Sequence, residues 1–566
     1  MLFPPDASDL LPRIPLSART ILDVGCGSGK RAAAYRLLNP KARLLGIDVD
    51  PASTALAAQH MHQVATLDVE ADPLPFDVPD GIDCIIYDEV LEHLRDPWTV
   101  IRRHAEALSP DGVMLICVPN IEYWRVAERL LRGTRQPGDG VDAQHRRFHG
   151  FNQDSIREDL NQAGLTLCDV STREPDAPAA AQFAASLAPG LEAIGVDPQD
   201  YAKRSAPSHL IWRVRKEPRQ RIILAGNMLA PVGGVSDVRV VLPLQAVGTD
   251  PMVTAGVVER MDFGHGGDGN ARIFVLHRPT LYGERGHAVL RRLSEAGFLI
   301  VTEFDDLPDR FEMMRMGGEL GFTGVHAIQT STLAMAEALR KYNPEIAVFP
   351  NAIGSLPEVR NFSDPRATTL FFGALNREQD WSPFMPTLNA VAAMAGDRLK
   401  FQVVHDRSFF EALETPHKSF TPTCDYATYL QILGSSDISF MPLADTRFNR
   451  AKSDLKFIEA AACRVAPLAS TVVYSNSIED GRTGLLFRDN VEFHARLLRL
   501  LAMPEMARDI ADAARRTVID NRMLAYQVAP RIAWYRSLWA RRVELTNALC
   551  ARMVAVPQRV DVPAEP

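Results

Sequence analysis

The sequence predicts an α/β protein built from three doubly wound parallel sheets that follow one another along the chain. Short buried apolar runs alternate with helical patterns, as expected where helices cover both faces of a parallel sheet. This alternation restarts after a charged, proline-bearing segment near residue 217 and again near Thr368. The 566 residues, of which 46% are hydrophobic, allow about three to four domains with separate cores.

The first series of strands begins at Thr20. Apolar runs predict strands at residues 20–24, 43–48, 64–68, 81–87 and 112–118, with two more at 165–170 and 209–214. An Ala/Pro-rich piece, residues 174–190, interrupts the series before the last strand, and we interpret it as a helical insertion. Together these elements predict one domain over residues 1–216.

Two further series follow the linker at residues 217–220. Strands are predicted at 221–226, 273–277, 298–304, 325–329 and 346–351, and then at 369–373, 400–405, 437–443 and 464–470. They predict a second domain over residues 221–355 and a third over 356–550. The remaining tail, 551–566, is predicted to be disordered.

Charge and cysteine content exclude several classes of protein. A net charge of -8 from mixed acidic and basic residues gives no basic field for nucleic acid. The seven scattered cysteines form no CxxC pair and indicate a reducing compartment. Neither a leader pattern nor a run of about 20 apolar residues is present, so we expect a cytoplasmic protein without a transmembrane segment. Peripheral membrane contact and the oligomeric state stay open.

The stretch "DVGCGSG" is the first candidate for a binding site. Gly25, Gly27 and Gly29 let the backbone pass close to a ligand and open a helix near Lys30, whose N-terminal amides favour an electron-rich group. Asp48 ends the next strand, where a carboxylate can accept both hydroxyls of a ribose. The glycine spacing is GxGxG, which departs from the GxGxxG fingerprint of dinucleotide sites.

Residues 20 to about 175 resemble the class I S-adenosylmethionine-dependent methyltransferases. The resemblance rests on "DVGCGSG", "GIDVD", "YDEVLEHL" and "SPDGVMLICVPN". It implies that S-adenosylmethionine is the cofactor. It also implies a set of cofactor-binding residues: Asp23 and Gly25 to Gly29 at the methionine part, Asp48 at the ribose, Asp68 and Val69 beside the adenine, and Tyr87 with Glu89 at the mouth.

A hydroxyl acceptor would benefit from a general base. His93 in "LEHL" and His145 in "QHRRFHGF" are the catalytic candidates, because both follow strands at the carboxyl edge of the sheet, where ligands bind. We expect the domain to methylate a sugar hydroxyl or a similar oxygen.

The stretch "FNRAKSDLKFIEAAACRVAPLAS", residues 448–470, predicts a helix with Ser453 as its N-cap. Lys452 and Lys456 near the start of this helix suit a diphosphate, and Glu459 can reach a ribose. By itself, an intrahelical pair between a surface Lys456 and Glu459 is the better explanation of the pattern.

Residues 220–545 resemble the GT-B glycosyltransferases, in which two Rossmann-like domains face each other across a cleft. The stretches that carry the resemblance are "APVGGVSDVRVVLPLQAVG", "QTSTLAMAEAL", "VFPNAI", "FFGALNREQDW", "DISFMPL", the lysine-bearing helix and "PLASTVVYSNSIEDGRTGLLF". The resemblance implies a nucleotide-sugar donor and a saccharide or glycolipid acceptor. It implies the following site residues: Glu459 on the ribose, Lys456 and Arg377 as the catalytic cations on the diphosphate, and Gly233 and Gly234 at the phosphates or acceptor.

Some positions depart from the GT-B pattern. The earlier of two glutamates expected eight residues apart is Ala451, and the usual Gly-Arg-Leu turn has Ala374 in place of arginine. The diphosphate would then depend on Arg377, Arg450 and Lys452. We interpret Asp305 and Asp306 as a strand-end turn and expect no metal, because cations and helix ends stabilise the leaving diphosphate in this class.

Three functions are compatible with these patterns. The first is a bifunctional methyltransferase and glycosyltransferase, as in the assembly of a bacterial surface polysaccharide. The second is a glycosyltransferase whose methyltransferase-like domain serves only for binding. The third is an NAD-dependent nucleotide-sugar oxidoreductase, which lacks support because the first domain has neither the GxGxxG spacing nor a Tyr-x-x-x-Lys pair.

Overall fold

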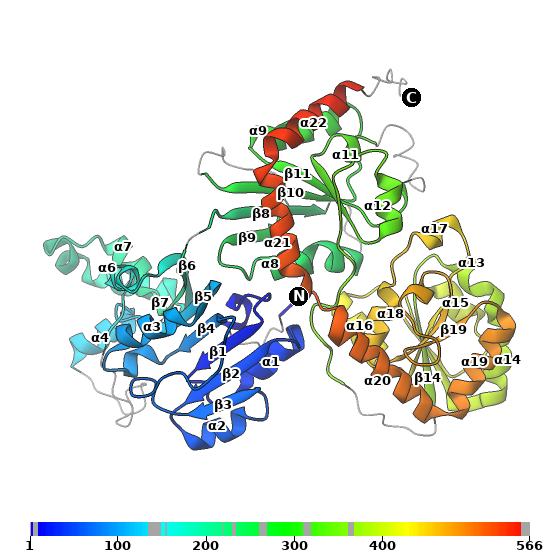
Figure 1. Ribbon diagram of the computed structural model, residues 1–566, viewed down its shortest axis with the longest axis horizontal. Coiled ribbons are helices and arrows are strands. Elements are labelled where there is room, and N and C mark those ends of the chain that lie inside the picture. Colours follow the sequence, from blue (N-terminus) through cyan, green and yellow to red (C-terminus); the bar gives the residue numbers. More distant parts are fainter. Residues whose placement is uncertain are drawn as a thin grey trace.

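The fold is described from a computed structural model of the chain (Figure 1). The described residues are 2–3, 9–133, 149–152, 155–217, 219–228, 234–259, 269–308, 319–359 and 367–555. Among them the strands form three sheets of seven, six and six strands. This arrangement confirms the predicted α/β class with three Rossmann-like sheets.

The first sheet has the order β3-β2-β1-β4-β5-β7-β6. Its strands are β1 (Thr20–Val24), β2 (Arg43–Asp48), β3 (Gln63–Thr66), β4 (Ile82–Asp88), β5 (Leu108–Pro119), β6 (Thr166–Pro175) and β7 (Pro207–Arg215). Strands β1 to β5 are parallel, whereas β7 runs antiparallel to both β5 and β6. The first residues of β7 therefore lie at the edge where β4 and β5 end.

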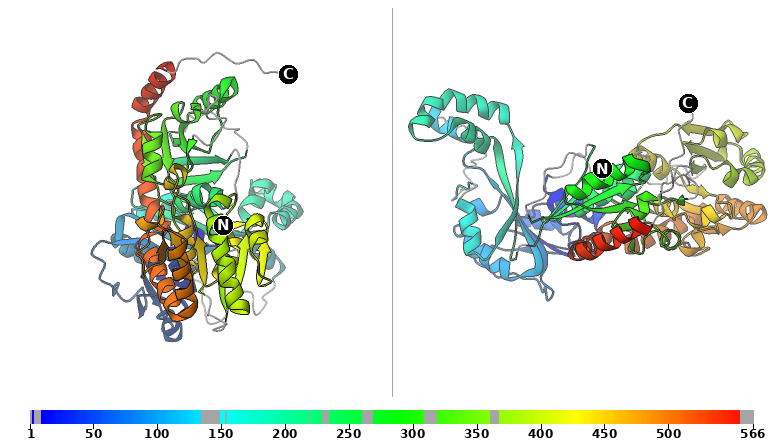
Figure 2. Two further views of the ribbon diagram at one scale, coloured as in Figure 1. Left: turned by 90° about the vertical axis from the view of Figure 1, so that its right-hand side faces the viewer. Right: turned by 90° about the horizontal axis from the view of Figure 1, so that it is seen from above.

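The helices of this domain follow the predicted alternation. They are α1 (Lys30–Leu38), α2 (Pro51–Ala57), α3 (Pro97–Glu106), α4 (Trp124–Arg132), α5 (Ser155–Gln162), α6 (Ala177–Ala193) and α7 (Pro198–Ser205), with a short turn η2 (Leu91–His93). The Ala/Pro-rich segment is helical, as predicted, and becomes α6. Figure 2 shows α6 and α7, in teal, at the end of the molecule far from the third sheet.

The second sheet is parallel throughout, with the order β13-β12-β11-β10-β8-β9. Its strands are β8 (Ile222–Met228), β9 (Val253–Val257), β10 (Ala271–His277), β11 (Leu299–Glu303), β12 (Ala327–Thr330) and β13 (Ile346–Val348). The helices beside it are α8 (Leu242–Val247), α9 (Gly283–Glu295), α11 (Leu320–Thr323) and α12 (Leu333–Leu339).

The third sheet has the order β16-β15-β14-β17-β18-β19 and is also parallel. Its strands are β14 (Thr368–Gly373), β15 (Leu399–Val404), β16 (Lys418–Thr421), β17 (Ile438–Met441), β18 (Ala466–Ser470) and β19 (Leu485–Phe487). Its helices are α13 (Glu378–Trp381), α14 (Met385–Ala395), α15 (Arg407–Ala412), α16 (Tyr426–Gly434), α17 (Arg447–Arg450), α18 (Leu455–Ala462), α19 (Asn490–Ala502) and α20 (Pro504–Asn521).

The chain then returns to the second sheet through α21 (Ala525–Ala540) and α22 (Arg542–Ala555), drawn in red in Figure 1. The Tyr535 hydroxyl donates to the Gln329 side chain at 2.8 Å. Arg552 donates to the Val325 carbonyl oxygen at 2.7 Å. The predicted third domain, 356–550, is therefore wrong at its end, because burial against the second sheet holds both helices there. Residues 551–555, predicted to be disordered, continue α22, and 556–566 lie outside the described residues.

The first domain shares a core with the second and with α21. One cluster of buried side chains joins Leu16 and Ile21 of the first domain to Leu224 and Val240 of the second and to Val528. Polar contacts accompany this core. Among them, the Leu16 amide donates to the Thr249 hydroxyl at 2.9 Å, and Arg215 pairs with Asp250 at 3.3 Å. None of the helices in the described part of the chain combines the length and the apolar character needed to cross a bilayer.

Candidate active sites

The glycine turn between β1 and α1 leaves room for a ligand at one of its three glycines. Gly25, Gly27 and Gly29 all have positive φ, at +74°, +51° and +75°, in the left-handed region that glycine adopts without steric cost. A Cβ at Gly25 would lie 2.4 Å from the Val90 side chain, and one at Gly29 would lie 2.9 Å from the Ala57 Cα. A Cβ at Gly27 would meet no atom within 4 Å, so the turn is open there.

Asp48, at the end of β2, lies beside this turn. One carboxylate oxygen accepts from the Gly27 amide at 2.9 Å, and the other accepts from the Asp50 amide at 3.0 Å. A carboxylate offers about four lone-pair sites, so acceptor capacity is left for ribose hydroxyls. Contact of the turn with the methionine part of S-adenosylmethionine, and of Asp48 with its ribose, stays a prediction.

The other predicted cofactor residues range from exposed to fully buried. Asp23 is 2% exposed and pairs with Arg31 at 2.8 Å. Asp68 is exposed after β3, and Val69 is buried in the core. The prediction that Tyr87 lines the mouth is wrong, because its side chain is fully buried in the core and its hydroxyl contacts His104 Nδ1 at 2.5 Å.

Two charged residues that the sequence reasoning missed, Asp88 and Arg173, lie beside the predicted Glu89 at the end of β4. Asp88 pairs with Arg31 and, at 2.9 Å, with Arg173 of β6. Arg173 also binds Glu89 at 2.8 Å and Asp9 at 2.9 Å. Because β6 is antiparallel and distant in sequence, only the folded sheet brings Arg173 to this edge. In the sequence, a single arginine in a strand with few apolar residues does not indicate that it lies at a binding edge.

Only one of the two predicted bases, His93, lies in the described part of the chain. His93 closes η2, is 31% exposed and lies 4.0 Å from Glu92. His145 lies outside the described residues. A third histidine, His209 of β7, lies at the same edge, with its Nε2 3.4 Å from Glu89.

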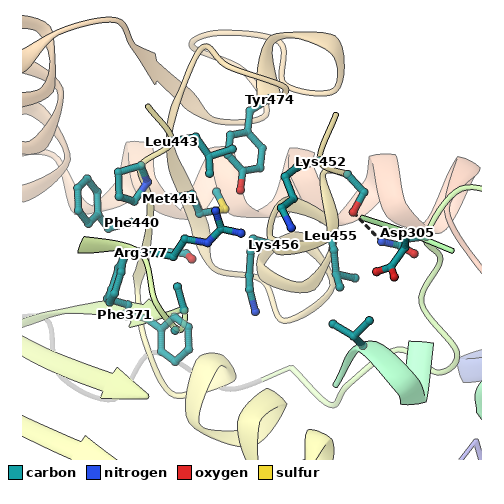
Figure 3. Close-up of a pocket in the computed structure, with 18 of the residues that line it drawn as sticks. Asp305, Phe371, Arg377, Phe440, Met441, Leu443, Lys452, Leu455, Lys456 and Tyr474 are labelled. Carbon is teal, nitrogen blue, oxygen red and sulfur yellow. Dashed lines mark hydrogen bonds between the residues drawn. The ribbon is translucent and has the colours of Figure 1, made fainter. Parts of the chain in front are cut away.

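The second candidate site is a cavity of about 180 Å³ between the second and third sheets. Arg239, Arg278 and Asp305 line it from the second domain. Residues of the third domain that line it include Arg377, Lys452 and Lys456. Figure 3 shows Lys452 and Lys456 lying between Arg377 and Asp305 around this cavity.

Each of the three cations from the third domain already has a partner. Arg377 contacts Asp380 at 3.3 Å and Asn449 at 3.1 Å. Lys452 reaches across the cleft to Asp306 at 3.0 Å, and burial, the largest cause, lowers the pKa of its ammonium. The Lys456 ammonium donates to the Tyr429 hydroxyl at 2.8 Å and keeps 38% exposure.

Glu459 differs from its predicted role at the ribose. It is 1% exposed, and Lys456 donates to its carboxylate at 3.3 Å, which is the intrahelical pair that the spacing also allowed. The carboxylate raises the pKa of Tyr426 and Tyr429, although burial is the larger cause. Contact with a ribose therefore stays a prediction that requires these neighbours to move.

Two other expectations for the residues just before α18 are wrong, namely Ser453 as the N-cap and Arg450 at the diphosphate. Helix α18 begins at Leu455 with Asp454 at its N-cap position, whereas the Ser453 hydroxyl accepts from Asn351 at 2.7 Å. Arg450, expected at the diphosphate, is 69% exposed and pairs with Asp445, because it lies at the surface end of α17.

The remaining predicted residues lie on the second domain. Gly233 is outside the described residues. Gly234 has φ +79°, and a Cβ added to it would lie 3.7 Å from the Tyr426 ring. Asp305 pairs with Arg278 at 2.7 Å, so the acidic pair at the end of β11 binds cationic side chains. Within the described ranges, no three His, Cys, Asp or Glu side chains come together as metal ligands would.

Fold and comparisons together define a methyltransferase domain followed by two Rossmann-like sheets with a cavity between them, the last of which carries a glycosyl transferase-like sequence. Residues 4–170 match the family described as "Methyltransferase domain", and residues 386–529 match "Glycosyl transferase-like". The chain belongs to the methyltransferase family through its first domain, and its third domain carries the glycosyl transferase-like sequence.

Curated relatives match the first domain. The chain is 31% identical over 178 residues to ubiquinone biosynthesis O-methyltransferase of Pseudomonas fluorescens (strain SBW25), covering 28% of this chain and 69% of that protein. It is 33% identical over 132 residues to trans-aconitate 2-methyltransferase of Azoarcus sp. (strain BH72), covering 23% of this chain and 51% of that protein. The chain spans about half the length of several of the curated relatives it matches.

A similar solved structure is sucrose-phosphate synthase of Thermosynechococcus elongatus. The TM-score is 0.41 at 15% sequence identity, and the match covers 57% of this chain and all of that one.

Proposed function

We propose that the chain is a bifunctional enzyme. Its GT-B module transfers a sugar from a nucleotide-sugar donor, and its first domain uses S-adenosylmethionine to methylate an oxygen of a saccharide or similar small molecule. The observation that carries the proposal is the presence of two separate sites in one chain: the turn at Gly27 with Asp48, and the cation-lined cavity at Lys456. Assembly of a cell-surface polysaccharide suits this pair of reactions.

In the glycosyl step, negative charge develops on the departing diphosphate. Cations that are already in place stabilise such charge without reorganisation at the moment of reaction. Lys456 and Arg377 are proposed for this role, with Lys452 contributing once Asp306 releases it. The proposed acceptor, a saccharide or glycolipid, enters from the second domain.

In the methyl step, the chain mainly has to align an attacking oxygen with the reactive methyl group. The bound cofactor supplies an activated methyl group. Asp48 would hold its ribose, the backbone at Gly27 would pass beside it, and Asp68 would lie near the adenine. Asp23 is proposed to act through Arg31 at the methionine end, because its own carboxylate is buried.

A mass-spectrometric screen tests the proposal. The full chain is incubated with UDP-, GDP- and TDP-sugars and S-adenosylmethionine in the presence of lipid-linked and free saccharides. The proposal predicts products that carry both an added sugar and an added methyl group. Sugar addition without methylation, together with no binding of S-adenosylhomocysteine in calorimetry, would instead favour the interpretation that the first domain is only a binding module.

A further inference from the structure

Two arginine side chains are buried between the second sheet and α21. Arg239 belongs to the helical turn η3 (Asp237–Val241), just before α8, and Arg531 belongs to α21. Each of these two residues is 2% exposed, and the carboxylate that acts on both, Glu303 at the end of β11, is also fully buried. A buried charge is costly unless a group of opposite charge compensates it.

The Glu303 carboxylate pairs with Arg239 and not with Arg531. Arg239 donates to one of its oxygens at 2.9 Å and to the other at 3.0 Å. The next carboxylate along the chain, Asp305, pairs with Arg278 at 2.7 Å. One positive charge, that of Arg531, is therefore left without a carboxylate of its own.

The Arg531 guanidinium has few partners for a buried charged group. Its Nη2 donates to the Gln527 side-chain oxygen at 3.2 Å, and the guanidinium lies 4.2 Å from the centre of the Phe349 ring. Its Nε and Nη1 are buried and have no hydrogen-bond partner among the described residues. Burial is the largest cause that lowers the pKa of Arg531, to about 10, so the side chain is still charged at neutral pH.

A small cavity lies beside this guanidinium. Its volume of about 10 Å³ gives room for about one group of the size of a water molecule. Its polar lining residues are Arg239, Gln329, Arg531 and Tyr535, and the other residues that line it are apolar. The Tyr535 hydroxyl donates to the Gln329 side-chain oxygen at 2.8 Å, so these two groups already satisfy each other. The cavity thus combines excess positive charge with a shortage of hydrogen-bond acceptors.

We propose that this cavity binds a small monovalent anion, such as chloride, held by Arg531. A halide accepts hydrogen bonds without donating any, and it supplies the negative charge that is missing beside the two arginines. A water molecule would leave the charge unbalanced and would need acceptors for its own protons. Since chloride is larger than water, the apolar lining has to give way slightly to admit it.

The anion would fasten α21 to the second sheet. Arg531 comes from α21, whereas Arg239 comes from the second domain and also lines the larger cavity between the second and third sheets. The site is thus separated from the proposed donor site by one side chain. The inference goes beyond the proposed function and does not depend on it.

Thermal unfolding of the full chain in two sodium salts tests the site. Chloride is compared with gluconate at equal ionic strength, because gluconate is far too large for the cavity. An anion that binds only the folded state stabilises it, so the melting temperature in 300 mM chloride should exceed that in gluconate by at least about 2 °C. Equal melting temperatures in the two salts would overturn the inference.

Arg531→Met locates the effect. The variant keeps most of the apolar part of the side chain but lacks its charge, so its melting temperature should be the same in both salts. Arg542→Met is the matched control, because Arg542 is exposed on α22 and donates to the Trp539 carbonyl oxygen at 3.3 Å. The control should keep the effect of chloride. An effect in Arg531→Met as large as in the wild type would place the anion elsewhere and reject the site.

Diffraction from wild-type crystals grown in chloride does not depend on the folding of a variant. Data collected at a long wavelength, where chlorine scatters anomalously, should show an anomalous peak in contact with the Arg531 guanidinium. Density for a water molecule at that position, without an anomalous signal, would contradict the proposal and assign the cavity to water.

Discussion

The buried carboxylate of Asp23 shows how strongly one position depends on its surroundings. Burial is the largest cause that raises the pKa of Asp23, to about 6, and the ion pair with Arg31 only partly opposes it. Because the folded-state pKa lies above the unfolded value of 3.8, this group stabilises the fold at low pH. That contribution is lost as the pH rises through about 6.

Asp23→Asn should remove this loss. Relative to the wild type, the variant is expected to gain up to about 3 kcal/mol in free energy of unfolding between pH 4 and pH 7.5, because one pKa unit corresponds to about 1.4 kcal/mol. Urea unfolding at both pH values measures the difference. Parallel behaviour of the two proteins across this range would show that the carboxylate is ionised throughout.

Lys456 is the residue on which the glycosyl step depends most. Lys456→Ala should lower sugar transfer at least about 100-fold, because a positioned donor to developing charge is removed. Its fold should persist, since the side chain is partly exposed and its hydrogen bonds within the described part of the chain go to Tyr429 and Glu459. Circular dichroism and the kinetics of sugar transfer measure the two effects.

Arg450→Ala is the matched control for this variant. Arg450 lies close in sequence and carries the same charge, but it is exposed and pairs with Asp445. Its removal should change transfer by less than about 2-fold, as expected for a surface ion pair. A loss in Arg450→Ala as large as in Lys456→Ala would point to overall charge, and not to position, as the cause.

At the scale of elements, the turn from β1 to α1 contains one glycine packed against backbone and one that faces open space. Gly29 lies against the backbone of α2, whereas Gly27 faces open space. Both have positive φ, where alanine costs about 1–2 kcal/mol. The contact with Ala57 adds a further cost only at Gly29.

Gly29→Ala should therefore lower the melting temperature more than Gly27→Ala. Gly27→Ala, in contrast, should weaken the binding of S-adenosylhomocysteine at least about 10-fold, because its methyl group enters the open space of the turn. Thermal unfolding of both variants measures the melting temperatures, and calorimetry measures their affinity for S-adenosylhomocysteine. Tight binding by Gly27→Ala would place the cofactor elsewhere.

The sequence patterns predict the long buried strands but not the short strands at the sheet edges. Long apolar runs such as 20–24 and 43–48 fall on β1 and β2, because a buried parallel strand must be apolar on both faces. Strands β9, β16 and β19 were not predicted as strands. All three are three to five residues long and lie at sheet edges, and most residues of β9 and β16 are exposed or half-buried.

In the candidate sites, only residues that lie close together in the sequence could be predicted as a group. Motifs on one continuous segment, such as the turn at Gly27, could be predicted, because strand, turn and helix are adjacent in sequence. The pairs Glu89 with His209 and Lys452 with Asp306 join residues that are far apart along the chain. Such pairs depend on strand order and on the way that two domains face each other, which local patterns do not contain.

At the scale of the whole molecule, the first domain contacts the segments that connect the second and third sheets. The Leu356 amide donates to the Leu37 carbonyl oxygen of α1 at 2.8 Å, and Lys41 lies 5.0 Å from the centre of the Tyr526 ring. Helix α1 begins at the glycine turn. A ligand at that turn thus lies one helix away from the connection between the second and third sheets.

Hydrogen exchange should detect this connection. Binding of S-adenosylhomocysteine stabilises only the folded state, so every segment that opens together with α1 becomes more protected. We expect slower exchange in peptides covering 30–38 and also in those covering 351–359 and 525–540. Protection confined to the first domain would show that the shared core opens in independent parts.

Calorimetric titration of one sample with two ligands in turn tests the central claim most directly. The full chain is titrated first with S-adenosylhomocysteine and then, once saturated, with UDP, GDP and TDP. We predict one equivalent of S-adenosylhomocysteine and one equivalent of a nucleoside diphosphate per chain, with neither displacing the other. Competition between the two ligands for a single site, or binding of only one of them, would contradict the account.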